Sequence, residues 1–222
     1  MLSELQRRVA GIVSALPEAR PFVLAGGGAL ILRGDVDRRT RDLDFFAPEV
    51  ADVDAMVPAL LGILEHEGLD VRPVQVTSGF ARLEVSDGRD TTEVDLGTDV
   101  TILPAEQREG IAVLSAEELA VDKVLAVFGR AQPRDFVDLY RLEPRFGIRQ
   151  LFAGAAIKDR GFDPGVFAEM TLQFGRFRPA DLGLDEQDRL AVERRVVLWR
   201  IAALEAARAL GRGTEHNHGL GL

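Results

Sequence analysis

The chain has 222 residues, of which 46% are hydrophobic and 28% are charged, a composition typical of one large or two small globular domains. Its net charge of −9 argues against a broad surface for binding DNA or other nucleic acids. No apolar run of about 18 residues is present to span a membrane. The N-terminal residues do not resemble a secretory signal, and without cysteine there are no disulfides or thiolate metal sites. We therefore expect a cytoplasmic protein with no membrane contact.

Helices and strands alternate in the first half of the chain. The spacing of apolar residues predicts helices over 2–16, 29–33 and 52–67. Extended apolar runs predict strands over 22–25, 42–46, 71–77, 80–86 and 91–96. Asp87-Gly88 lies between the last two runs and is a strong signal for a hairpin.

The composition changes after about residue 103, and from Ser115 onward the pattern is helical. The predicted helices cover 115–129, 134–142, 151–157, 164–174 and 185–210. The residues from about 211 to 222 form a polar, glycine-containing tail that we expect to be flexible. The fold class is therefore α/β (α+β), with an N-terminal domain over 1–110 and a helical domain over 111–222.

Three consecutive glycines, Gly26, Gly27 and Gly28, separate the first predicted strand from a helix. Glycine lacks a Cβ, so a backbone of this kind can come close to a bulky anion. The unpaired N–H groups at the start of a helix favour negative charge, which suits a triphosphate. Alternatively, the glycines only allow the helix to pack close to the strand. Neither the dinucleotide-binding pattern nor the P-loop is met.

Asp42 and Asp44 lie two residues apart in an apolar extended run, so a strand would place both side chains on one face. Two neighbouring carboxylates repel each other unless a cation lies between them. Magnesium, a hard ion with oxygen ligands, suits such a pair. The alternative is a solvent-facing strand with two ordinary charges. The flanking residues Leu43, Phe45 and Phe46 favour a largely buried strand and hence the metal site.

A third carboxylate would strengthen the metal interpretation. Asp95 lies in another apolar strand, with Glu93 as the nearby alternative. Three carboxylates on two adjacent strands could hold two metal ions, the arrangement that stabilises in-line phosphoryl displacement. Asp95 could equally be an exposed hairpin residue.

The order of these motifs resembles the AbiEii/AbiGii toxin family of the nucleotidyltransferase superfamily. The resemblance rests on LAGGGAL, on RRTRDLDFF, and on a later K-x(6)-R followed by RDFVDLYRL. By motif it covers about residues 21–142. It implies a core like that of DNA polymerase β, a small mixed sheet carrying a glycine turn and an Asp-x-Asp pair, followed by a helical C-terminal domain.

The resemblance also implies roles for particular residues. Gly26 and Gly27 match the glycine turn, Asp42 and Asp44 match the metal-binding pair, and Asp95 is the best match to the third acid. Gly28 departs from the family pattern, in which Ser or Thr commonly stands, so a side-chain contact to phosphate is in doubt.

Further matches lie in the helical half. Lys123 matches a family lysine, and Arg134-Asp135 with Asp138 match the Arg-Asp-x-x-Asp element. Lys123 could neutralise triphosphate charge as a point cation or could be a snorkelling lysine at a helix edge. Arg130 and Arg134 could face the nucleotide or pair with Asp135 or Asp138.

Arg38, Arg39 and Arg41 precede the Asp-x-Asp strand. They could steer an acidic substrate such as RNA or only solubilise a loop. The three histidines, His66, His216 and His218, form no recognisable constellation.

The expected reaction moves a nucleoside monophosphate from an NTP to an acceptor hydroxyl, with Mg²⁺ or Mn²⁺ as cofactor. Asp42, Asp44 and Asp95 would bind the metal, Asp95 could accept a proton, and Gly26 to Gly28 with Lys123 would hold the phosphates. The resemblance implies a toxin of a toxin–antitoxin or phage-defence system, with tRNA or another RNA as one acceptor and a cognate antitoxin as a partner. The alternatives are a non-catalytic nucleotide-binding module and an antibiotic-modifying nucleotidyltransferase.

Overall fold

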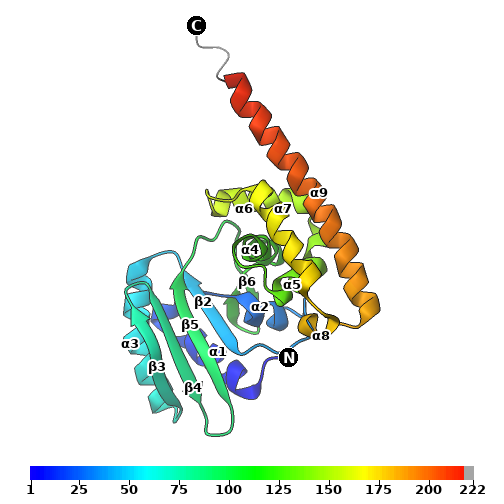
Figure 1. Cartoon of the computed structure of the whole chain (residues 1–222). Helices are drawn as coiled ribbons and strands as arrows, with labels where there is room; N and C mark the ends of the chain where they lie inside the picture. Colours follow the sequence, from blue (N-terminus) through cyan, green and yellow to red (C-terminus); the bar gives the residue numbers. More distant parts are fainter. Residues whose placement is uncertain (218–222) are drawn as a thin grey trace. The chain divides into compact units, whose positions relative to one another are not determined.

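A computed structural model of the chain describes residues 1–217 (Figure 1). The chain forms two compact units, one from Met1 to Leu119 and one from Ala120 onward. We describe each unit by itself. Among the described residues, no helix combines the length and the apolar character that crossing a membrane requires.

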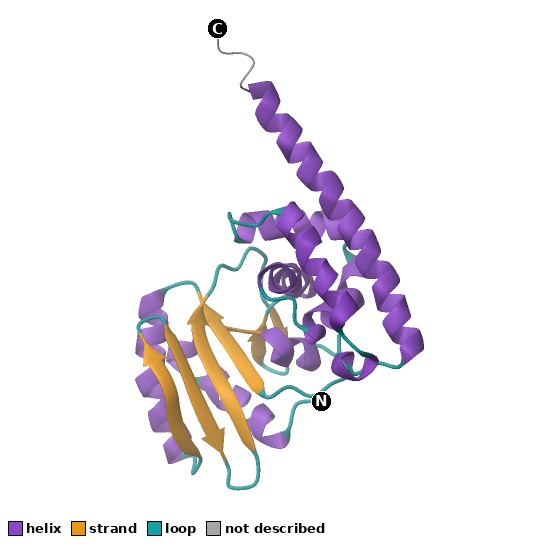
Figure 2. Cartoon of the chain, viewed as in Figure 1, coloured by secondary structure: helices purple, strands orange, loops and turns teal. Residues whose placement is uncertain are grey.

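The first unit is built on one mixed sheet, seen as orange arrows in Figure 2. The strand order is β3-β4-β5-β2-β1-β7-β6. The pairs β2–β5 and β1–β7 are parallel, and the other neighbours are antiparallel. The strands are β1 (Val23–Ala25), β2 (Asp42–Ala47), β3 (Asp70–Thr77), β4 (Phe80–Ser86), β5 (Thr91–Thr98), β6 (Glu106–Arg108) and β7 (Ile111–Val113). The mixed α/β fold expected from the sequence is confirmed.

Two helices, α1 (Glu4–Ala15) and α3 (Val50–His66), cover one face of this sheet. They contact each other, and both contact β5. Residues of β2 alternate between buried and partly exposed, as a strand with one covered face should. Phe45 lines a cavity with Val13 of α1, so the Leu43–Phe45–Ala47 set faces the helices. Asp42 and Asp44 therefore lie on the opposite face, which we call the carboxylate face.

The glycines form the first turn of α2 (Gly26–Leu32) rather than a loop before it. The sequence predicted a helix only from Ala29. At the junction, Gly26 takes a left-handed backbone conformation with φ of +59°, which glycine adopts without strain. The strand β1 therefore leads into the helix with no intervening loop.

The hairpin of β6 and β7 was not expected from the sequence. Each strand has three residues, too short for an alternating pattern to be recognised. Its turn contains Glu109 and Gly110, both with positive φ. Because β7 pairs with β1 in register Leu24↔Val113, residues 111–113 belong to the sheet of the first unit.

The second unit is helical. Its elements are α4 (Ala116–Gly129, which begins in the first unit), α5 (Pro133–Leu142), α6 (Ile148–Lys158), α7 (Pro164–Met170), α8 (Pro179–Leu182) and α9 (Glu186–Asn217). Short 3₁₀ turns over 143–145 and 171–176 connect them. The helix α9 contacts α5, α6, α7 and α8 and inserts the fully buried Trp199. It extends into the expected tail as far as Asn217, and residues 218–222, including His218, lie outside the described residues.

Candidate active site

Four carboxylates occupy neighbouring positions on the carboxylate face. In the parallel pairing of β2 with β5, Asp42 lies beside Glu93 and Asp44 lies beside Asp95. Residues paired in this way point to the same side of the sheet, and adjacent strands are about 4.8 Å apart. The structure thus brings together the Asp-x-Asp pair and both candidates for the third acid.

The glycine turn lies directly against this cluster. A Cβ on Gly26 would stand 1.9 Å from Asp44 Oδ2. A Cβ on Gly27 would stand 2.8 Å from Thr40 Oγ1 and 3.2 Å from Arg38 Nη2. Only glycine fits at these two positions, because any side chain would displace a polar group of the site. Of the basic residues before β2, Arg38 therefore reaches the turn, whereas Arg39 and Arg41 are exposed.

Gly28 has a different environment. A Cβ there would meet Leu43 Cδ2 at 3.1 Å and Leu24 Cδ1 at 3.4 Å, both in the core. A side chain at position 28 would therefore start among buried leucines and not beside Asp44. A Ser or Thr side chain at this position would therefore not begin beside the carboxylates, so its absence takes no such group from them.

Two residues of the site were not predicted from the sequence. The Thr40 hydroxyl donates to Asp42 Oδ1 at 2.5 Å, which orients that carboxylate. Arg82 of β4 donates from Nε to Asp95 Oδ1 at 2.7 Å and from Nη2 to Asp95 Oδ2 at 2.5 Å. The Asp95 side chain is only 9% exposed, and Arg82 Nε is also 3.7 Å from Glu93 Oε2. The hydrogen bonds to Asp95 hold the pKa of Arg82 above its ordinary value.

Asp42 and Asp44 offer donor atoms that suit one hard cation. Asp42 and Asp44 are neighbouring oxygen donors on one strand face, the ligand type that Mg²⁺ and Mn²⁺ prefer. Within residues 1–217, no group of three or more Asp, Glu, His or Cys side chains is arranged to hold a metal ion. Asp95 is the third acid by position, but Arg82 binds both of its oxygens. Its role as a metal ligand stays a prediction.

Lys123 forms a buried ion cluster in the second unit. Its Nζ lies 3.2 Å from Asp135 Oδ1 and 3.0 Å from Asp138 Oδ2. Arg130 donates to both oxygens of Asp135, at 2.9 and 3.1 Å. Burial raises the pKa of Asp135, but the hydrogen bonds from Arg130 and the charge of Lys123 outweigh it and lower the pKa overall. Arg134, in contrast, is exposed.

This cluster balances its own charge. Lys123 and the two aspartates are almost completely shielded from solvent, and the ammonium group lies within ion-pair distance of both carboxylates. A phosphate that binds Lys123 would have to compete with Asp135 and Asp138 for its ammonium group. The predicted roles of Lys123, Arg134 and Asp138 in nucleotide binding stay predictions.

A glycine turn placed against an Asp-x-Asp strand, within a small mixed sheet, defines a nucleotidyltransferase core. Comparison with known families agrees: the chain belongs to the family of AbiEii nucleotidyl transferase toxins of type IV toxin–antitoxin systems, whose model matches residues 9–209. It is thus a nucleotidyltransferase toxin by family. No curated protein sequence matches the chain.

Solved structures share the fold. MenT4, a nucleotidyltransferase toxin from Mycobacterium tuberculosis, is 19% identical over 88% of this chain and 82% of that one, with a TM-score of 0.59. JHP933 from Helicobacter pylori is 18% identical over 99% of both chains, with a TM-score of 0.52. At sequence identities this low, the similarity to these structures shows a shared fold and nothing more.

We predict that Gly26→Ala disrupts the site locally. The added Cβ must displace the Asp44 carboxylate, and the left-handed backbone costs a further 1 kcal/mol or so for alanine. Titration with Mn²⁺, followed by electron paramagnetic resonance, should show at least about tenfold weaker binding, equivalent to about 1.4 kcal/mol. Gly62→Ala in α3 is the matched control, because a Cβ there meets nothing within 4 Å. Equal Mn²⁺ affinity in the Gly26 variant and the wild type would contradict the close approach.

We predict that Asp135→Asn destabilises the chain in a pH-dependent way. Removing one partner of a buried ion cluster costs about 3 kcal/mol at neutral pH. Because the folded pKa of Asp135 is lowered, its contribution is complete above the unfolded pKa and declines as the pH falls through the folded pKa. Urea denaturation of both proteins should therefore give curves that converge below about pH 4. Asp181→Asn, in the exposed pair with Arg178, should have a much smaller effect; a pH-independent loss in Asp135→Asn would refute the assignment.

Proposed function

We propose that this chain transfers a nucleoside monophosphate from an NTP to an acceptor hydroxyl and releases pyrophosphate. The observation that supports the proposal is the close approach of the glycine turn to Asp44, which sets a backbone suited to phosphate beside a pair of carboxylates suited to a metal ion. The acceptor oxygen forms a bond to the α-phosphorus, and the bond from that phosphorus to the β-phosphate oxygen breaks.

Asp42 and Asp44 would hold Mg²⁺ or Mn²⁺, which when bound offsets the negative charge of the reacting phosphates. The backbone of Gly26 to Gly28 holds the β- and γ-phosphates close to these carboxylates. Thr40 fixes the orientation of Asp42 through its hydroxyl. Asp95, the neighbour of Asp44 across the parallel pair, is the residue we assign to accept the acceptor's proton. Lys123, with Arg134 and Asp138, is the proposed source of further nucleotide contacts.

Charge is divided unevenly between the two units, which supports RNA, including tRNA, as the acceptor. Residues 1–119 contain 11 Lys and Arg against 22 Asp and Glu, whereas the remainder contains 16 against 14. The net charges are therefore −11 and +2. Phosphate-rich RNA is repelled by the first and tolerated by the second.

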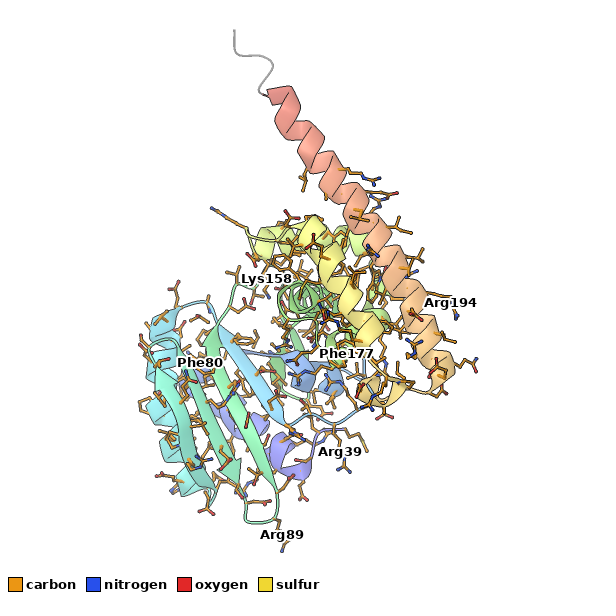
Figure 3. All side chains as sticks on the ribbon, in the orientation of Figure 1. Arg39, Phe80, Arg89, Lys158, Phe177 and Arg194 are labelled. Carbon is orange, nitrogen blue, oxygen red and sulfur yellow. The ribbon has the colours of Figure 1, made fainter. Side chains whose placement is uncertain are left out.

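A groove in the second unit offers specific contacts for such an acceptor. It encloses about 520 Å³ and is lined from α5, the turn after it, and α9. Tyr140, Arg141, Arg194 and Leu198 belong to its lining, and Figure 3 shows Arg194 projecting from α9. An aromatic ring beside guanidinium groups suits stacked bases and phosphates. An RNA-modifying toxin in the cytoplasm, controlled by a cognate antitoxin, is consistent with the family.

Turnover tests the reaction directly. The wild type, incubated with α-labelled NTPs and Mg²⁺ or Mn²⁺, should transfer label to total RNA, and Asp44→Asn should reduce that rate at least about 10²-fold. Arg72→Gln, an exposed residue of the same sheet, is the control. The same assay should also be run with protein and with small molecules that carry hydroxyl groups, such as aminoglycosides, as acceptors. NTP binding without transfer to any acceptor would favour a non-catalytic nucleotide-binding module. In that case the structural reason would be that Arg82 binds both oxygens of Asp95.

We expect the groove to contribute to RNA affinity. Arg141→Ala combined with Arg194→Ala should weaken binding of single-stranded RNA about tenfold at 0.1 M salt. The slope of log K against log salt should fall by about 0.7 for each phosphate that the variant no longer neutralises. Arg160→Ala, an exposed arginine that is not part of the groove lining, should change neither quantity. An unchanged salt slope in the double variant would place the RNA elsewhere.

A further inference from the structure

Arg82 occupies a central position on the carboxylate face. It lies directly opposite Asp95 in the antiparallel pair of β4 and β5, and Asp95 lies directly beside Asp44 in the parallel pair of β5 and β2. The three side chains therefore form one row across three strands. A guanidinium thus stands in the same row as a proposed metal ligand, with a single carboxylate between them.

The contact between Arg82 and Asp95 is two-pronged. Nε binds one carboxylate oxygen at 2.7 Å and Nη2 binds the other at 2.5 Å. Paired N–H donors of this kind give the strongest and most directional form of the arginine–carboxylate contact. The side chain of Asp95 is 9% exposed, while that of Arg82 is 40% exposed. Little solvent therefore reaches the carboxylate to replace the arginine.

The same guanidinium also lies near another acid of this face. Arg82 Nε is 3.7 Å from Glu93 Oε2. Four carboxylates, Asp42, Asp44, Glu93 and Asp95, share the two strands, and Arg82 supplies positive charge to them without any bound ion. If a divalent ion also bound Asp42 and Asp44, little of the negative charge of the four carboxylates would remain to attract a second ion.

A second arginine on the same sheet provides a comparison. Arg72 of β3 pairs with Glu84 of β4, with Nη2 2.9 Å from Oε1. Both side chains are far more exposed than Asp95, at 65% and 37%. This pair lies in the row that contains Glu93 and Asp42. It resembles the Arg82 pair in chemistry, but it is more exposed and lies outside the row that contains Asp44.

We propose that Arg82 is a positioning residue that takes the place of a second cation: by holding both oxygens of Asp95 it limits the site to one divalent ion, bound by Asp42 and Asp44. The proposal rests on the function proposed above. In this arrangement Asp95 lies beside the metal without being its ligand. The nucleotidyltransferase core then works with one exchangeable ion and one fixed guanidinium.

The test is the number of Mn²⁺ ions bound per chain, measured by electron paramagnetic resonance on the full-length protein. The wild type should bind one. Arg82→Gln, which releases both oxygens of Asp95, should bind two. The double variant Arg82→Gln/Asp95→Asn should return to one, because the second ion depends on the freed carboxylate. Asp95→Asn alone should keep one ion with an affinity within about threefold of the wild type.

Arg72→Gln is the matched control and should also bind one ion. Circular dichroism spectra and urea denaturation of each variant establish that it is folded, and if Arg82→Gln does not fold, Asp95→Asn alone decides. Two ions in the wild type, one in folded Arg82→Gln, or loss of the wild-type ion in Asp95→Asn would each overturn the proposal. No bound ion in the wild type would instead refute the metal site of the proposed function, and a single ion lost in Asp42→Asn would verify that site independently.

Discussion

The approach of Gly26 to Asp44 is the contact on which the rest of the first unit depends. The space for a Cβ at position 26 is filled by a carboxylate oxygen, so β1, the turn and β2 can adopt this arrangement only with glycine there. Gly26 also has a positive φ, and α2 follows β1 directly at this residue. Both the backbone conformation and the nearby Asp44 carboxylate therefore require glycine at the start of the helix.

The site also depends on the difference between the two faces of the sheet, of which one is buried and the other partly exposed. Leu43, which lies between the two aspartates in the sequence of β2, is fully buried on the covered face of that strand. Its neighbours must then point the other way, toward Glu93 and Asp95. Hydrophobic burial on one face therefore offsets the cost of gathering like charges on the other, and Arg82 and Thr40 reduce the remaining repulsion through hydrogen bonds.

Much of this could be predicted from the sequence, because the strongest signals are local. The two-residue period of a strand places Asp42 and Asp44 together, and three glycines between a strand and a helix indicate a close approach. Arg82 could not be assigned in this way. Asp87-Gly88 suggests a two-residue turn, which would oppose Arg82 to Glu93, whereas the strands pair Ser86 with Thr91 around a four-residue loop. That difference moves Arg82 opposite Asp95. The pairing of Arg130 with Asp135 was one of the alternatives that the sequence offered. The participation of Lys123 could not be predicted, because it depends on how α4 and α5 pack.

The parallel pairing of β2 with β5 affects the stage of folding at which the site can form. Between the two strands the chain must form α3, β3 and β4, so Asp44 meets Asp95 only through a contact between distant segments. Such non-local pairings form slowly compared with helices and hairpins. During synthesis, the ribosome has to deliver the whole of β5 before the carboxylate face can exist. The four carboxylates therefore come together only when β5 has paired with β2.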